Sequence, residues 1–345
     1  MKKVSTLSID LAKNVFQLLG VDSQGYPCLS KRLSRSKFKE TIVNLPPCDI
    51  VMEACASSHF WGRACLAAGH QVNLIPAQHV TPFVRGNKND KNDCLAIYEA
   101  SRRPNIRFVP VKTEQQQAVL IPHRMRERVL SARTACINQT RSLLLEFGID
   151  IPQSYNKFKQ ELRGLLTHSL QPAVLLMISE VCDELTCFER KIHLLDDLFK
   201  QENTRSEAAQ IIQSIPGIGL INTSAFVASI DKGQAFKSAK EFAVWLGLTP
   251  SQYASGNTNR LGSITKRGDG YLRKQLIHGA RTVVTHANKK DDDLSRWITT
   301  LKQRRGHNKA VVATAHRLAR LMWILLQKNE PYRPQYTQQG AVHNV

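Results

Sequence analysis

Four acidic residues in the first third of the chain could bind a divalent cation together. Asp10 ends the strand-like run V-S-T-L-S-I-D, and Glu53 ends a second short run, D-I-V-M-E. Asp90 and Asp93 are three residues apart at the start of a helical segment, so both carboxylates lie on one side of that helix. Burial of a strand does not require an acid at its end, since a buried charge is costly without a partner. These acids therefore need a further explanation.

Carboxylates that gather at one place require a counter-charge. Two unit charges about 4 Å apart interact by roughly 4 kcal/mol at an effective dielectric near 20, so four acids together repel or take up protons. Mg²⁺ or Mn²⁺ removes that repulsion and prefers hard oxygen ligands. Two such ions can stabilise the attacking and leaving oxygens of a phosphodiester. The structural alternative is that Asp10 is a solvated strand-end acid and that Asp90 and Asp93 cap their helix.

A second chemical candidate, Ser255, lies far along the chain. It precedes Gly256 in the polar, glycine-rich and basic stretch S-Q-Y-A-S-G-N-T-N-R-L-G-S-I-T-K-R-G, where a serine is most often a turn residue. A hydroxyl is a poor nucleophile at neutral pH unless a base or a metal activates it. If it attacked a DNA phosphate, a phosphoserine ester would keep the bond energy and strands could be rejoined without ATP. The chain has no G-x-x-x-x-G-K-[ST] phosphate loop, which agrees with such chemistry.

The charge balance favours a polyanionic partner. The 345 residues include 48 Lys and Arg against 28 Asp and Glu, a formal charge of +20, and nucleic acid is the first candidate. No apolar run approaches the roughly 20 residues that a membrane span requires. Asp10 and Lys13 interrupt the region where a signal peptide would be apolar. The eight cysteines form no C-x-x-C pair, so we expect neither a zinc site nor disulfides, and a cytosolic protein with reduced thiols.

The N-terminal region, residues 1–105, is predicted to be an α/β domain. Three strands in a meander, followed by helices that alternate with strands, are typical of a ribonuclease-H-like sheet. The predicted strands are 4–10, 15–21, 28–33, 49–53 and 71–75, and the predicted helices are 36–45 and 59–68.

The next region, residues 106–205, is predicted to be a helical connector. Its basic helical segment 113–147 contains Pro122, which predicts a break or a helix start there. The arginines of this segment either form a solvated face or follow phosphates, in which case binding would weaken steeply with salt; they include Arg124, Arg128, Arg133 and Arg141. Apolar residues from Val174 to Phe199 are spaced alternately four and three apart, which predicts a coiled-coil helix. That helix could pack against 123–147 or pair two protomers.

Residues 206–328 are predicted to form a mainly helical domain, followed by a flexible tail, 329–345. The turn S-I-P-G-I-G, with Gly217 and Gly219, either brings backbone amides to a phosphate or is simply a good turn between helices. Basic residues that flank Ser255 are further candidates for nucleic-acid binding: Arg260, Lys266, Arg267, Arg273 and Lys274.

These motifs together resemble one known family. The phrases S-I-D-L-A-K, V-M-E-A-C-A-S-S-H-F-W and N-K-N-D-K-N-D-C-L-A surround the four acids, and G-L-T-P, S-G, K-R-G and L-R follow in the C-terminal region. Their order is similar to that of the DEDD transposases, insertion-sequence recombinases with a RuvC-like domain, over residues 4 to about 328. Many relatives have an alanine where this chain has Cys94 and an asparagine where it has Asp269.

The resemblance implies a RuvC-like domain, a coiled-coil connector and a helical transposase domain. It implies that Asp10, Glu53, Asp90 and Asp93 bind Mg²⁺ and that Ser255 is the nucleophile, so that the acids and the serine have to meet within one chain or between chains. It further implies a structured bridge RNA that pairs with donor and target DNA, and dimers or tetramers assembled through the connector. Such a protein would act in the bacterial cytoplasm, at the nucleoid.

The expected function is therefore a DNA transposase that cuts and rejoins strands. One alternative is a metal-dependent, structure-specific nuclease such as a junction resolvase, in which Ser255 is only a turn residue. A second is a non-catalytic nucleic-acid scaffold. A third is an ATP-using relative of the ribonuclease-H-like group, such as a sugar kinase, although the chain lacks glycine-rich phosphate motifs after its first strand.

Overall fold

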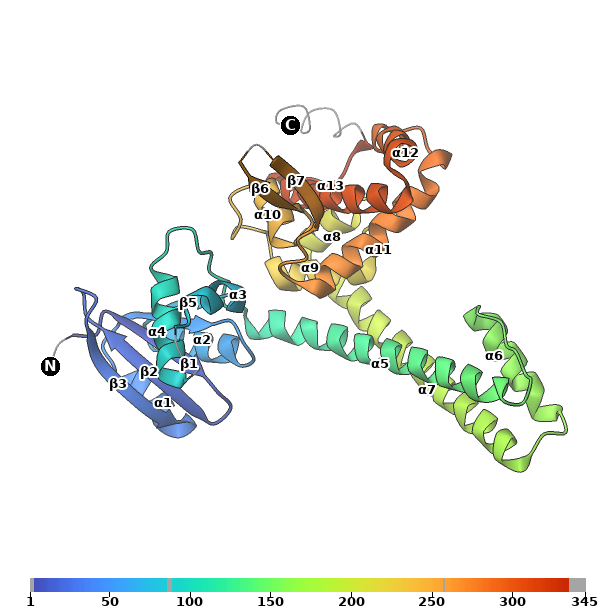
Figure 1. Cartoon of the computed structure of the whole chain (residues 1–345), viewed down its shortest axis with the longest axis horizontal. Helices are drawn as coiled ribbons and strands as arrows, with labels where there is room; N and C mark the ends of the chain where they lie inside the picture. Colours follow the sequence, from blue (N-terminus) through green and yellow to red (C-terminus); the bar gives the residue numbers. More distant parts are fainter. Residues whose placement is uncertain (1–2, 86–88, 257, 335–345) are drawn as a thin grey trace. The chain divides into compact units, whose positions relative to one another are not determined.

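The structure is a computed structural model of the chain, and it describes residues 3–85, 89–256 and 258–334 (Figure 1). It divides into two compact units, Met1–Gln115 and Gln116–Val345, each described below by itself. No helix in the described ranges is both long enough and apolar enough to cross a membrane.

The first unit contains the strands and helices that its sequence predicts, with ends shifted by no more than two residues where a range was predicted. Its strands are β1 (Thr6–Leu11), β2 (Val15–Val21), β3 (Pro27–Ser34), β4 (Asp49–Glu53) and β5 (Gln71–Ile75). Its helices are α1 (Arg35–Asn44), α2 (Ser58–Ala67), α3 (Ala77–Val80), the 3-10 turn η1 (Thr81–Phe83) and α4 (Asp90–Ser101).

The strands of this unit form one twisted sheet in the order β3-β2-β1-β4-β5. The meander β1, β2, β3 is antiparallel, whereas β4 runs parallel to both β1 and β5. This is the predicted ribonuclease-H-like arrangement, and it places β1 in the middle. Parallel strands have their carboxyl ends at the same edge of a sheet, so β1 and β4 deliver the residues that follow them to one place.

Both faces of the sheet are covered. Alternate side chains of β1 point to opposite faces, so β1 contributes to the packing on each. On one face Ile9 packs with a cluster in which Phe16, Phe38 and Trp61 are in ring contact at centroid distances of 4.7 to 5.0 Å. On the other face the fully buried hydroxyl of Ser8 donates to a backbone carbonyl of α4 at 2.6 Å. That hydrogen bond holds the first turns of α4 against the central strand.

The second unit is mainly helical. Its elements are α5 (Glu114–Leu145), which begins at the end of the first unit, α6 (Tyr155–Gly164), η2 (Leu165–Thr167), α7 (Pro172–Thr204), α8 (Glu207–Gln213), α9 (Leu220–Ile230), α10 (Ala239–Trp245), β6 (Pro250–Ser255), β7 (Thr258–Ile264), α11 (Gly270–His286), η3 (Ala287–Lys289), α12 (Asp293–Arg305) and α13 (His307–Lys328).

The two long helices α5 and α7 pack on one another and, with α6, form a helical arm (Figure 1). The predicted heptad seam of α7 is buried there against Val129, Ile137 and Leu144 of α5. Of the two arrangements that the spacing left open, the structure therefore contains the packing within one chain. A coiled coil between protomers along this seam is not shown.

Pro122 neither breaks nor starts a helix, so that expectation is wrong: it lies inside α5. The residue after it, His123, is buried where α5 meets α9 and α11. Its ring stacks on Phe199 at 4.1 Å, Nδ1 lies 2.9 Å from the Tyr271 hydroxyl, and Nε2 lies 3.0 Å from the Ser224 hydroxyl. These contacts fix the helix next to the proline and offset the backbone hydrogen bond that proline removes.

We predict that His123→Ala destabilises the second unit by about 2 to 4 kcal/mol at pH 7.5, because packing and two buried hydrogen bonds are lost. Burial, with Arg126 and Arg124 nearby, lowers the pKa of His123 to about 4. In the unfolded chain the His123 imidazole has its ordinary pKa near 6.5, so it takes up a proton below that pH, whereas in the folded chain it stays neutral down to about pH 4. The contribution of His123 to the free energy of unfolding is therefore lost as pH falls from 6.5 towards 4.

Urea unfolding at pH 7.5 and pH 5 measures this. The difference in free energy of unfolding between wild type and His123→Ala should be about 2 kcal/mol smaller at pH 5 than at pH 7.5. The exposed His193 on α7 provides a control, since His193→Ala should stay within about 0.5 kcal/mol of wild type at both values. A gap that is independent of pH would contradict this explanation.

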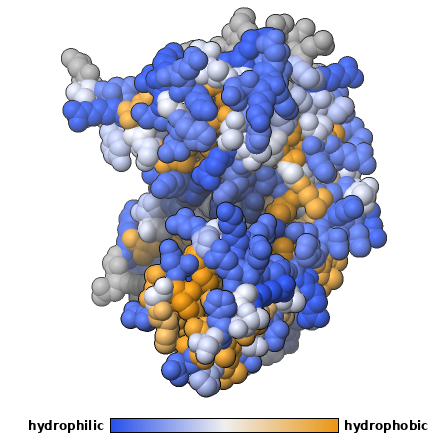
Figure 2. Space-filling view, turned by 90° about the vertical axis from the view of Figure 1, so that its right-hand side faces the viewer, coloured by the Kyte–Doolittle hydropathy of each residue, from blue (hydrophilic) through white to orange (hydrophobic). Residues whose placement is uncertain are grey.

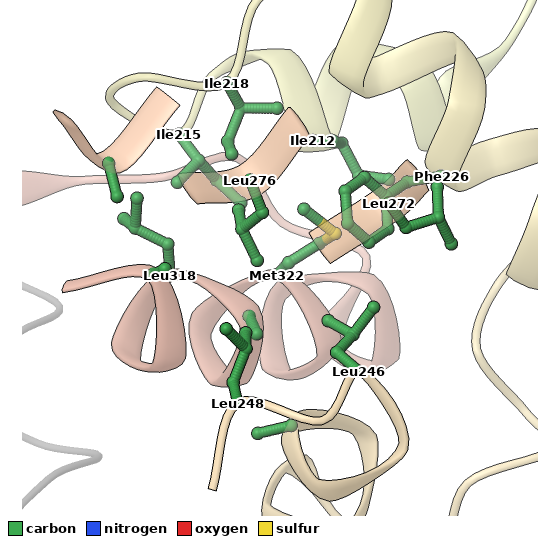
Figure 3. Packing of buried hydrophobic residues seen from close by; sticks show 14 of the residues in the cluster. Ile212, Ile215, Ile218, Phe226, Leu246, Leu248, Leu272, Leu276, Leu318 and Met322 are labelled. Carbon is green, nitrogen blue, oxygen red and sulfur yellow. The ribbon is translucent and has the colours of Figure 1, made fainter. Parts of the chain in front are cut away.

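Helices α8 to α13 enclose the core of the second unit (Figure 3). Ile215, Leu276 and Met322 lie together at its centre, and the segment around Leu246 and Leu248 packs against α13. The first residues of the predicted flexible tail also belong to this core: Tyr332 packs against it, and its backbone N–H donates to the Ser214 hydroxyl at 2.7 Å. The first part of the predicted tail thus contacts this core through Tyr332. The flexibility of the tail stays a prediction, and residues 335–345 lie outside the described ranges.

The polar stretch around Ser255 is an antiparallel hairpin, which the sequence did not predict. We call the pair β6 and β7 the serine hairpin; it lies beside α10 in Figure 1. Backbone hydrogen bonds hold its base, from Thr265 N–H to the Thr249 carbonyl and from Lys266 N–H to the Gly247 carbonyl. Gly268 adopts φ +93° directly against the Trp245 carbonyl, where a side chain would not fit. The hairpin thus rises from a rigid base.

Asp269 ends this base as the N-cap of α11, accepting hydrogen bonds from the backbone N–H groups of Tyr271 and Leu272 at 2.8 and 3.0 Å. Asparagine caps helices about as well as aspartate, so we predict that Asp269→Asn changes the free energy of unfolding by less than about 0.5 kcal/mol, whereas Asp269→Ala costs about 1 kcal/mol. Thermal unfolding of both variants checks this. If Asp269→Asn were as destabilising as Asp269→Ala, the carboxylate would matter through its charge and not as a cap.

Candidate active site

Asp10 and Glu53 lie side by side at the carboxyl ends of two adjacent strands, β1 and β4. The parallel register pairs Ile9 of β1 with Met52 of β4, so the next residue of each strand is an acid. Both acids are half-buried, and both lie at the carboxyl ends of their strands. The predicted proximity of these two residues therefore follows directly from the observed strand pairing.

The other two acids reach the same edge through α4. Asp93 directly precedes the buried Cys94, whose carbonyl accepts the Ser8 hydroxyl at 2.6 Å and whose Sγ lies 3.1 Å from the carbonyl oxygen of Gln17 in β2. The N-terminal turn of α4 is thus held on β1 and β2. The helix cap is Asn89, which accepts from the Asn92 N–H at 2.8 Å, and both acids lie in the first turn.

Two cysteines report the field of these carboxylates. Burial raises the pKa of the Cys94 thiol to about 12, and Asp10, Asp93 and Asp90 contribute to the increase. Burial also raises the pKa of Cys55, with added contributions from Glu53 and then Asp10. Asp10 contributes to the raised pKa of both thiols, so it is close to Cys55 and to Cys94.

The donor set suits a hard divalent cation, because all four candidates are carboxylates. Within the described ranges, however, no three His, Cys, Asp or Glu side chains are already arranged as a ligand set. Asp90 is exposed and lies 4.0 Å from the Arg32 guanidinium, which is an alternative partner for it. Carboxylates repel one another without a counter-ion, so a convergent set is not expected before a cation binds.

Ser255 is exposed as the last residue of β6, where it is paired with Thr258 of β7. Residue 257, between the two strands in sequence, lies outside the described ranges. Arg260, Lys266 and Arg267 are exposed on or just after the same hairpin. Arg273 is half-buried and donates to the carbonyls of Leu246 and Arg267 at 3.1 and 3.4 Å, so it also holds the hairpin base.

The basic residues of α5 differ in their surroundings. Arg124 and Arg128 are exposed, and Arg124 lies over the Tyr271 ring at 5.9 Å. Arg133 and Arg141 instead serve the joint between α5 and α6. Arg133 lies over the Tyr155 ring at 4.6 Å, and Arg141 donates to the carbonyls of residues 152 and 153 at 2.7 and 2.8 Å.

Three further candidates have local structural contacts. Lys274 forms an ion pair with Glu127 across α11 and α5. Gly217 has φ +78° and lies so close to the backbone of Gly279 in α11 that a side chain would clash, which explains this glycine by packing. Gly219 is the exposed N-cap of α9.

The sequence did not assign a role to His59, and in the structure it holds the segment around Lys112. Its Nδ1 accepts the backbone N–H of Lys112 at 3.1 Å, and Arg63 donates to the Lys112 carbonyl at 2.8 Å. Burial, helped by Lys112 and Arg63, lowers the pKa of His59 to about 4, so the ring is neutral at pH 7. The available signal was its place in the motif, six residues after Glu53.

Two family profiles match this chain. The DEDD transposase profile, described as "Transposase", matches residues 7–149, which include the four acids. The profile described as "Transposase IS116/IS110/IS902 family" matches residues 209–295, which include Ser255. The two chemical candidates thus fall in separate profiles of transposases.

Full-length relatives agree with the profiles. A Pseudomonas aeruginosa protein named "Probable family 20 transposase" is 42% identical over 337 residues, covering 96% of this chain and 99% of the relative. The transposase for insertion sequence element IS1111A of Coxiella burnetii is 37% identical over 336 residues, covering 96% and 92%. The transposase for insertion sequence element IS1328 of Yersinia enterocolitica is 35% identical over 334 residues, covering 94% and 97%. The chain therefore belongs to the IS116/IS110/IS902 family of insertion-sequence transposases, enzymes that cleave and transfer DNA strands.

Proposed function

We propose that this transposase cuts and rejoins DNA through a covalent ester on Ser255, with a Mg²⁺ or Mn²⁺ site formed by Asp10, Glu53, Asp90 and Asp93. The observation that supports the serine role is its position: an exposed hydroxyl at the end of a strand on a hairpin with a rigid base. The observation that supports the metal role is that Asp10 and Glu53 end adjacent parallel strands while α4 is held on the same strands.

In each step of the serine reaction one P–O ester bond forms and one breaks. The Ser255 hydroxyl gives up its proton, Oγ bonds to phosphorus, and the bond from phosphorus to a sugar oxygen breaks, so that oxygen leaves and takes a proton. A sugar hydroxyl of a second strand then attacks the phosphoserine and releases the serine. No nucleotide cofactor is consumed, because each new P–O bond replaces one of the same kind.

When bound, the cation would supply Lewis-acid stabilisation of charge on phosphate oxygens. The residues of this chain hold it by charge and by position: Asp10 and Glu53 from the strand ends, Asp93 and Asp90 from the first turn of α4. His59 and Ser8 act as positioning residues, because they fix the segment 109–112 and the start of α4. Arg128, Arg260, Lys266 and Arg267 supply exposed positive charge to nucleic-acid phosphates.

We further propose that the polyanionic partners are donor and target DNA and a structured bridge RNA encoded by the same element, and that the protein acts in the bacterial cytoplasm at the nucleoid. The net charge of +20 supports polyanionic partners. The three-part division at about residues 105 and 206 remains a prediction within this proposal.

A second copy of the chain is the proposed partner for the helical arm, giving a dimer or a dimer of dimers. The seam of α7 is filled within the chain, so the contact would use the outer surface. Large apolar side chains are exposed at the far end of the arm: Leu143, Leu145, Phe147, Leu166 and Leu176. Figure 2 shows apolar groups among a mostly hydrophilic surface. Exposed apolar patches of this kind are typical of protein interfaces.

We predict that Ser255→Ala abolishes the covalent protein–DNA adduct and lowers strand transfer by roughly 10³-fold or more, because the nucleophile is removed. Denaturing electrophoresis of full-length protein with labelled element DNA and Mg²⁺ measures the adduct. The exposed Ser263, on the partner strand of the hairpin, provides the control, and Ser263→Ala should form the adduct at wild-type level. A Ser255→Ala protein that still cuts DNA would instead indicate a metal-dependent nuclease in which the serine has no chemical role.

A further inference from the structure

The serine hairpin has two different faces, which its strand register defines. Tyr253 is paired with Arg260 and Ser255 with Thr258, and directly opposed residues of an antiparallel pair lie on the same face. Side chains two residues apart on one strand also share a face. Tyr253, Arg260 and Ser255 are therefore together on one face of the hairpin.

Side-chain contacts agree with this division. A Cβ atom at Gly262 would lie 3.4 Å from a ring carbon of Tyr253, so the tyrosine ring lies along the hairpin on the face it shares with Arg260. The same Cβ would lie 2.5 Å from the hydroxyl oxygen of Ser251, so Ser251 lies on this face as well. On the opposite face, the Gln252 side chain donates to the Asn259 side chain at 3.2 Å, next to Leu261.

Tyr253 is a strongly exposed aromatic side chain. It is 70% exposed, and within the described ranges β6 and β7 form a sheet of only two strands. A large aromatic side chain on such a hairpin contributes little to the core, so folding does not explain it. Aromatic rings next to basic groups are the usual platform for the bases of an unpaired nucleic-acid strand, because every base has a π-face.

We propose that Tyr253 and Arg260 form a binding site for an unpaired nucleotide beside the phosphate that Ser255 attacks. This inference rests on the proposed serine chemistry and names the substrate class for it. The Tyr253 ring stacks on the base, and the Arg260 guanidinium, directly across the hairpin, pairs with a backbone phosphate.

The spacing fits this assignment. A strand rises about 3.3 Å per residue, so the Cα atoms of Tyr253 and Ser255 are roughly 7 Å apart. Successive nucleotides of one strand rise about 3.4 Å when stacked. The stacked base therefore belongs to a nucleotide one or two steps from the reacting phosphate.

The base must be unpaired because the faces of a base inside a duplex are covered by its neighbours. The site therefore selects DNA that is opened at the cut over intact duplex. A protein partner is the competing occupant of an exposed tyrosine, but Arg260, Lys266 and Arg267 are all exposed on or just after the hairpin, and this charge favours a nucleic acid.

Leu261 provides a matched control for the test. It is also 70% exposed and is paired with Gln252, which places it on the opposite face of the same hairpin. The full-length protein is used with Ser255→Ala in every sample, so that binding is measured without reaction. The probe is a single-stranded DNA oligonucleotide that carries 2-aminopurine, whose fluorescence is quenched when the base stacks, and the competitor is the same sequence as a duplex.

Tyr253→Ala should weaken binding of the single strand by about 5- to 100-fold and remove the quenching, whereas Tyr253→Phe keeps both. Leu261→Ala should change the affinity by less than about twofold. Arg260→Ala should lower the slope of log affinity against log salt concentration by about one, as expected for one lost phosphate contact.

Equal affinities and equal quenching for Tyr253→Ala and Leu261→Ala would overturn the inference, as would equal losses for single-stranded and duplex DNA. A tyrosine that contacts a protein partner would give the first of these results. Failure of the serine chemistry is detected separately, as DNA cleavage or an adduct that persists in Ser255→Ala. The two proposals can therefore fail independently.

Discussion

The parallel pairing of β1 with β4 is the constraint on which the acidic group depends. It brings Asp10 and Glu53 to the same edge of the sheet with only one strand spacing between their backbones, about 4.8 Å. Two carboxylates at that separation repel unless a cation or a proton compensates them. The hydrogen bond from Ser8 to the Cys94 carbonyl then keeps α4, with Asp93 in its first turn, on the same strands. A cation at this edge would remove the repulsion between the carboxylates and be attracted by both of them.

In the proposed mechanism the second unit has a different task, since it would present the Ser255 hydroxyl to a large polyanion. A buried serine could not do so, and the buried Ser224 is instead a hydrogen-bond partner of His123. Ser255 is exposed on a hairpin whose base is fixed by Gly268 and Asp269 against α10 and α11. Exposure gives access, and the rigid base limits the positions that the hydroxyl can take. Both properties suit the nucleophilic role that we propose for Ser255.

The sequence predicted those features that burial or strict spacing specifies. The strands of the first unit were found because their apolar runs are bounded by turns, whereas the observed pairing of β1 with β4 is what brings Asp10 next to Glu53. The serine hairpin was missed because both of its faces are solvated, so no apolar alternation marks it. Pro122 was misjudged because the contacts of His123 come from residues far along the chain. Arg141 was not recognised as a structural residue for a similar reason. Its carbonyl partner lies in the connection between α5 and α6, whose direction the sequence does not predict.

The central claim is that these carboxylates bind a catalytic cation, and anomalous diffraction from crystals of the full-length protein grown with Mn²⁺ tests it most directly. A Mn²⁺ peak should lie between the carboxylates of Asp10 and Glu53, with an oxygen of Asp93 or Asp90 within about 2.5 Å. The peak should be lost in Glu53→Gln and kept in Asp49→Asn, which changes the exposed acid at the other end of the same strand. An empty edge in the wild-type protein, or a peak that persists in Glu53→Gln, would contradict the account.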